Sequence, residues 1–113
     1  MVDDGVRAYV DAIDRHRDLW DRVHRLALEA HPDAEIVLSY GMPTFVVGER
    51  RLHVGVWRHG LSFYGWGADH DAGFTARHPG WAGDRGTLKL RPRDAASVDD
   101  DELRGFLRAT LAP

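Results

Sequence analysis

The chain has 113 residues, of which 43% are hydrophobic and 29% are charged, a composition typical of one globular domain that buries a core without cross-links. It contains no cysteine, which excludes disulfides, thiolate nucleophiles and cysteine-ligated metal centres. A net charge of −3 and a pI near 6.1 give nucleic acid no overall attraction. We therefore treat residues 1–113 as a single domain and expect no nucleic-acid partner.

The sequence also bears on location. Its first twelve residues carry three aspartates and no apolar segment of the kind found in signal peptides. No apolar run approaches the roughly 18 residues that a membrane-spanning helix needs. The expectation is a cytoplasmic protein with no membrane partner.

Apolar residues recur at helical spacing over residues 6–30, which predicts helix with one buried face. Residues 14–18 offer no apolar anchor, so either two helices with a break there or one long helix is expected. Asp18 is the predicted cap of the second helix. His31 is the predicted end, because a residue that precedes proline disfavours the helical conformation.

Beyond Pro32 the apolar period changes to two, which indicates β-strands. Apolar alternation predicts four short strands, at residues 36–38, 45–47, 52–56 and 61–63. The sequence Gly41-Met42-Pro43 predicts a sharp turn between the first two, because glycine tolerates positive φ and proline restricts itself and its predecessor. Residues 48–50 and 58–60 predict the other two hairpin turns.

The last third predicts a mixture of short elements. Residues 69–77 favour a short helix capped by Asp69 with Phe74 facing inward, and glycines predict a loop over residues 78–86. Residues 86–90 predict a last strand, and a terminal helix is expected to start at Ser97 or Asp99. This order predicts an α+β fold: a single antiparallel sheet of about five strands, with two N-terminal helices and one C-terminal helix on one of its faces.

Strand alternation places an unusual set of side chains on the sheet face that the helices leave uncovered. They are aromatic, basic or small and polar: Arg51, His53, Trp57, Ser62, Tyr64, Trp66, Thr87, Lys89 and Arg91. Gly55 would leave a gap among them where a ligand or another backbone approaches closely. The face is therefore either an open binding surface or one that the chain itself, or a second copy in a homodimer, covers.

The run Ser39-Tyr40-Gly41-Met42-Pro43-Thr44-Phe45, preceded by Pro32-Asp33-Ala34-Glu35, resembles the signature of the YdhG-like family, a bacterial domain of unknown function. Residues 53–64, the Gly-Thr strand at 86–90 and the terminal helix are similar to the family pattern as well, so the resemblance spans essentially the whole chain. It implies a frataxin-like fold and, for one branch, an iron chaperone. The family's usual lysine before the Gly-Thr strand is replaced here by Arg85. The positive charge is kept, but a role that needs lysine itself is not.

Metal binding has two sets of candidate ligands. An iron chaperone would use the aspartates of the first helices, Asp3, Asp4, Asp11, Asp14, Asp18 and Asp21, but arginines interleave with them, and opposite charges at helical spacing pair with one another. Asp69-His70-Asp71 and His78 also offer ligands, at no recognised metal-site spacing. The iron-binding role is therefore kept as an alternative, and no metal or cofactor is predicted.

The predicted function is non-catalytic binding of a small molecule or a protein on the open aromatic face; a homodimeric interaction module is the second alternative. His53 and Tyr64 could act as acid and base, but no nucleophile with a base and an orienting group can be assembled, so we do not predict an enzyme. Arg85 and Thr87 flank a glycine in a way that suits an anion. The predicted ligand-binding residues are Tyr40, Met42, His53, Trp57, Tyr64, Trp66, Arg85 and Thr87.

Overall fold

A computed structural model describes residues 3–83 and 87–113. Two helices, α1 (Asp4–Asp11) and α2 (Arg17–Ala30), precede four strands, β1 (Glu35–Ser39), β2 (Met42–Val47), β3 (Arg50–Trp57) and β4 (Gly60–Tyr64). Two 3₁₀ turns, Ala68–His70 and Pro79–Trp81, flank α3 (Phe74–Arg77). The chain ends with β5 (Thr87–Leu90), α4 (Pro92–Ala96) and α5 (Asp100–Leu111).

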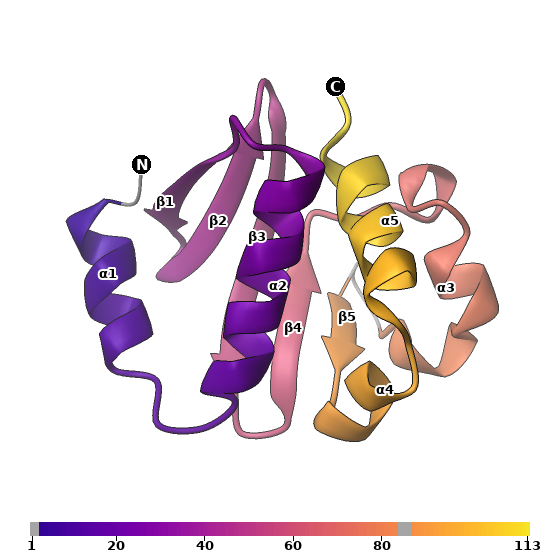
Figure 1. The fold of residues 1–113 in the computed structure, drawn as a ribbon, viewed down its shortest axis with the longest axis horizontal. Helices are drawn as coiled ribbons and strands as arrows, with labels where there is room; N and C mark the ends of the chain where they lie inside the picture. Colours follow the sequence, from indigo (N-terminus) through magenta and orange to yellow (C-terminus); the bar gives the residue numbers. More distant parts are fainter. Residues whose placement is uncertain (1–2, 84–86) are drawn as a thin grey trace.

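The five strands form one antiparallel sheet in the order β1-β2-β3-β4-β5, so each strand pairs with its neighbours in sequence. The helices α2 and α5 lie side by side across one face of this sheet (Figure 1). The core fills the space between these helices and the sheet. It is built on large apolar side chains, which include Trp20, Phe45, Phe63, Phe74 and Phe106. The predicted α+β class and single antiparallel sheet are confirmed. No helix in the described ranges is long and apolar enough to cross a membrane.

The first two helices are separate, with the break where the apolar pattern fails. Asp18 is not the cap of α2, which begins one residue earlier; the cap position is His16, whose backbone is left-handed with φ of 64° and whose side chain makes no capping bond. Asp18 lies in the first turn instead, where a carboxylate still favours the helix dipole. The helix ends at Ala30, as the proline two residues later predicts.

The first hairpin turn is tighter than predicted. Tyr40 and Gly41 form it alone, with φ of 52° and 72°, and two successive positive values match the twist of a two-residue hairpin. Met42 and Pro43 already belong to β2 and pair with β1. Pairing of β2 with β3 begins only at Thr44, one residue after Pro43, which fits a residue that has no N–H to donate.

Residues 69–77 are not one helix. The buried carboxylate of Asp71, rather than Asp69, caps α3: it accepts hydrogen bonds from the Gly73 N–H (3.0 Å), the Thr75 N–H (3.0 Å) and the Thr75 hydroxyl (2.6 Å). Phe74 is fully buried, as predicted. The short helix α4 was not predicted, and α5 begins at Asp100 with Asp99 as its cap.

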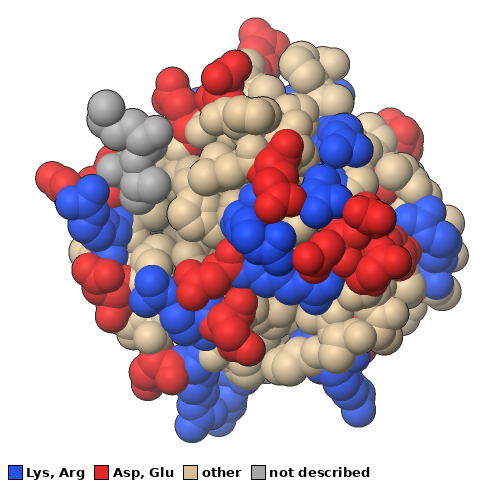
Figure 2. All heavy atoms as spheres, viewed as in Figure 1, with Lys and Arg blue, Asp and Glu red and all other residues tan. Residues whose placement is uncertain are grey.

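Ion pairs join the two central helices on their solvent side, where Figure 2 shows acidic and basic side chains interleaved. Arg22 of α2 is the central one, because its guanidinium donates at 2.8 Å to the Ala95 and Val98 carbonyls and to the Asp100 carboxylate. The Ala95 carbonyl lies in the last turn of α4 and the Val98 carbonyl between α4 and α5, where helix ends leave acceptors unsatisfied. Arg25 also reaches Asp100, at 3.1 Å, but its side chain is half exposed.

We expect Arg22→Met to lower the free energy of unfolding by about 1–3 kcal/mol, because two carbonyls and a carboxylate lose a charged donor together. Arg25→Met is the matched control and should cost less than about 1 kcal/mol, as exposed ion pairs do. Urea unfolding followed by tryptophan fluorescence measures both. Equal midpoints for the two variants would refute the role given to Arg22.

Candidate functional site

The sheet face opposite α2 and α5 brings most of the predicted site residues together. His53 of β3 lies between Thr44 of β2 and Tyr64 of β4, and Tyr64 pairs in turn with Thr87 of β5. The Nδ1 atom of His53 is 2.7 Å from the Thr44 hydroxyl. The ring of Tyr40, which is 87% exposed, stands edge-on to the His53 ring with centroids 5.4 Å apart. These five residues form one continuous row with an aromatic rim.

The gap expected at Gly55 is already filled by the chain. A Cβ atom at Gly55 would lie 2.5 Å from Nε1 of Trp57 and 3.0 Å from the Met42 sulfur. The indole of Trp57 therefore folds back over the glycine, beside Met42, and remains 46% exposed. The absence of a side chain at Gly55 serves to seat this indole flat on the sheet, and it leaves no opening there for a ligand.

One predicted site residue, Trp66, does not join this face. Trp66 packs against the hydrophobic core, and its Nε1 is buried without a partner among the described residues. The reason is Gly65, whose φ of 92° ends the alternation of β4 before Trp66 is reached. Arg85 lies outside the described residues. Tyr40, Met42, His53, Trp57, Tyr64 and Thr87 are the predicted residues that the sheet places together.

One polar pair on this face was missed from the sequence. His59, in the turn between β3 and β4, places its Nε2 atom 3.0 Å from the hydroxyl of Ser62. Ser62 is buried, and its partner on β5 is Lys89. Burial lowers the pKa of His59, and the neighbouring cations Lys89 and Arg91 lower it further. Both effects favour the neutral imidazole.

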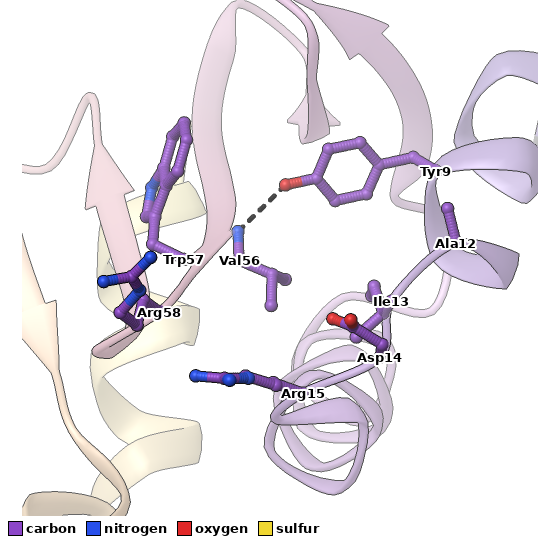
Figure 3. A pocket seen from close by; sticks show the side chains of 8 residues that line it. All are labelled: Tyr9, Ala12, Ile13, Asp14, Arg15, Val56, Trp57 and Arg58. Atoms are coloured by element: carbon purple, nitrogen blue, oxygen red, sulfur yellow. Dashed lines mark hydrogen bonds between the residues drawn. The ribbon is translucent and has the colours of Figure 1, made fainter.

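The main cavity lies at the end of the sheet, between the α1–α2 loop and the β3–β4 turn (Figure 3). Its volume is about 540 Å³, and its lining is Tyr9, Ala12, Ile13, Asp14, Arg15, Val56, Trp57 and Arg58. Trp57 belongs to both the cavity and the aromatic sheet face. None of the other seven was predicted, because they come from segments more than 40 residues apart whose contact no local pattern indicates.

Two hydrogen bonds hold the walls of the cavity together. The Val56 N–H donates to the Tyr9 hydroxyl at 3.0 Å, which ties α1 to β3. The Nε2 atom of His16 lies 2.9 Å from the Arg58 carbonyl, which ties the α1–α2 loop to the β3–β4 turn. Both contacts bridge the same gap and together hold the two walls of the cavity in place.

The predicted metal ligands do not converge. His70 contacts Asp69, its neighbour, at 2.8 Å, while Asp71 caps α3 and His78 contacts Glu102 at 2.9 Å. Asp3 caps α1 and also accepts from the Leu38 N–H. No group of three or more potential ligands that could hold a metal ion occurs within residues 3–83 and 87–113.

No family model matches this sequence, and no curated protein or solved structure resembles it at a significant level. The resemblance to the YdhG-like family remains an expectation from the sequence. Function must therefore be argued from the geometry of the cavity and of the sheet face that adjoins it.

We expect Gly55→Ala to displace the Trp57 indole from the sheet, because the new methyl group would occupy its place. The indole N–H resonance of Trp57, assigned with Trp57→Phe, should shift, and acrylamide should quench this tryptophan more strongly. Gly105→Ala on α5 is the control, since a Cβ there meets no atom within 4 Å. An unchanged Trp57 indole resonance in Gly55→Ala would contradict the placement of this indole over Gly55.

Acid should destabilise the fold through His53 and His59, whose pKa values burial lowers from the ordinary 6.5. As the pH falls through 6.5, these histidines bind protons in the unfolded chain more readily than in the folded chain, where their pKa values are lower. The free energy of unfolding therefore decreases. Urea midpoints between about pH 7.5 and 5.5 test this, above the range near 4 where carboxylates titrate. His59→Gln should make the urea midpoint depend less on pH. An unchanged dependence in this variant would show that His59 does not contribute to the loss of stability in acid.

Proposed function

We propose that this chain is a non-catalytic binding module of the YdhG-like type, with the cavity between the α1–α2 loop and the β3–β4 turn as its ligand site. The observation that supports it most is the cavity itself. Its volume of about 540 Å³ falls in the range of small-molecule sites, which are mostly apolar with a few converging polar groups. Here apolar side chains from the α1–α2 loop and β3 stand beside a tyrosine hydroxyl and three charged side chains.

Trp57 is the residue on which we expect binding to depend. Its indole is seated on Gly55 and braced by Met42, so it loses little freedom when a ligand packs against it. It also connects the cavity with the row of Tyr40, His53 and Tyr64 on the sheet face. A ligand longer than the cavity would extend along that row.

A homodimer is the second candidate, and one observation favours it. The large apolar side chains most exposed in the described part of the chain are Leu38 (42%), Tyr40 (87%) and Trp57 (46%). Exposed apolar side chains that gather on one surface often mark an interface with another chain. Tyr40 and Trp57 both border the sheet face, so a second copy could cover it.

Titration of the ¹⁵N-labelled chain with indole, a neutral planar probe that fits the cavity, tests the proposal. We expect chemical-shift changes in the amide signals of Trp57, Val56 and Ala12. The Kd for indole should be at least about tenfold higher in Trp57→Ala, because the indole ring of the probe loses its stacking partner. Tyr40→Ala is the matched control: it removes an exposed ring that does not line the cavity and should leave the Kd unchanged.

The two candidates give different results in this experiment. If indole changes the chemical shifts of Tyr40 and Tyr64, and not those of Val56 and Ala12, the binding site is on the sheet face. A mass that doubles with concentration in light scattering, and returns to that of one chain in Trp57→Glu, would favour the homodimer. Absence of any shift with indole would refute the cavity as a site for planar ligands.

A further inference from the structure

Two arginines face the cavity from opposite walls. Arg15 comes from the α1–α2 loop and Arg58 from the β3–β4 turn, and Figure 3 shows the Arg15 side chain extending from its loop toward Arg58. Neither forms an ion pair with any residue in the described ranges, although the nearby Arg17 pairs with Asp21 at 3.1 Å. Two arginines that are left without carboxylates at a cavity are available to a ligand.

The distance between these arginines is restrained by the backbone. His16 follows Arg15 directly, and its ring contacts the carbonyl of Arg58 at 2.9 Å. The contact joins the two loops at the residues that carry the guanidinium groups. The two loops that carry the cations are therefore already fixed relative to each other before a ligand arrives, which lowers the entropy lost on binding.

The region around the cavity is positively charged beyond these two side chains. Lys89 and Arg91 are close enough to His59, in the same turn as Arg58, to lower its pKa. Asp14 is the acidic residue in the cavity lining. The local field thus favours an anion even though the chain as a whole carries a net charge of −3.

Tyr9 supplies a further donor. Its hydroxyl oxygen accepts the Val56 N–H, so the hydroxyl proton itself is directed elsewhere, and no acceptor for it occurs among the described residues. A phenolic hydroxyl in this state can donate to a ligand oxygen. Trp57 also lines the cavity, and its indole, 46% exposed, offers a flat surface that suits a ring.

We propose that the cavity binds a small planar molecule that carries a carboxylate or a phosphate, with its ring against Trp57 and its anionic group between Arg15 and Arg58. Guanidinium groups bind both oxyanions through paired hydrogen bonds. This assignment rests on the proposed function, which it narrows from planar ligands in general to anionic ones. A basic or uncharged ligand would leave both arginines unpaired.

The test compares three indoles that share a ring and differ in charge: indole-3-acetate, its neutral isostere indole-3-acetamide, and the cation tryptamine. NMR titrations of the ¹⁵N-labelled chain should give indole-3-acetate a Kd about tenfold lower than the amide, the value of one charge-assisted interaction, and should place tryptamine last. Raising NaCl from 50 to 500 mM should weaken the acetate alone. Inorganic phosphate and phenyl phosphate distinguish a site for the free anion from one that needs the ring.

Charge-removing variants locate the anion. Arg15→Gln and Arg58→Gln should each reduce the preference for the acetate over the amide by several-fold, and the double variant should abolish it while amide binding stays unchanged. Arg108→Gln, in the last turn of α5 and absent from the cavity lining, is the matched control and should keep the full preference. Well-dispersed amide spectra confirm that the variants are folded.

The possible failures are distinct. Equal affinity for the acetate and the amide overturns the anionic assignment and leaves the proposed function standing. A preference that survives in the double variant overturns the role of the two arginines. If neither indole nor any of the three charged or neutral derivatives binds, both the assignment and the proposed function fail.

Discussion

Three two-residue turns fix the register of the first four strands, and the rest of the molecule depends on that register. They are Tyr40-Gly41, Gly48-Glu49 and Arg58-His59. Side chains alternate along a strand, so a slip of one residue would exchange the two faces of the sheet. Phe45 and Leu52 would then leave the core under α2 and α5, and His53 would be buried there without its partner Thr44. The turns therefore decide both the core and the composition of the outer face.

The cavity arises where this register ends. If the pairing of Thr44 with His53 is continued along the two strands, β3 extends beyond the first residue of β2. The Val56 N–H therefore has no partner in β2. A backbone N–H that is withdrawn from water needs an acceptor, and the Tyr9 hydroxyl of α1 provides it. The same contact holds the end of α1 over the sheet and creates the space behind it. Satisfaction of one backbone group thus accounts for the position of the cavity.

The sequence predicted those parts of the site that depend on alternation within a strand. His53, Tyr64 and Thr87 share a face because parity alone places them there, and the three strands that carry them were predicted from apolar period. Trp66 was assigned wrongly because a glycine with positive φ ends the alternation, and sequence does not distinguish such a glycine from one in a regular strand.

The cavity was not predictable by the same reasoning. Tyr9 and Val56 are 47 residues apart and meet through a hydroxyl and an amide, while Arg15 and Arg58 belong to loops with no periodic pattern. Gly55 illustrates the limit most clearly: its lack of a side chain indicated close approach, but only the structure identifies the approaching group as the chain's own Trp57.

The charges around His59 also bear on whether this histidine can act as a base toward Ser62. Its Nε2 atom and the Ser62 hydroxyl are 3.0 Å apart, the separation of a nucleophile and its base. Proton transfer would create an imidazolium, yet the neighbouring Lys89 and Arg91 are cations and lower the pKa of His59. Among the described residues no carboxylate contacts His59 to stabilise the protonated base as in hydrolases, and Ser62 is only 1% exposed. The cations that oppose proton transfer here would instead attract an anionic ligand to the adjacent cavity.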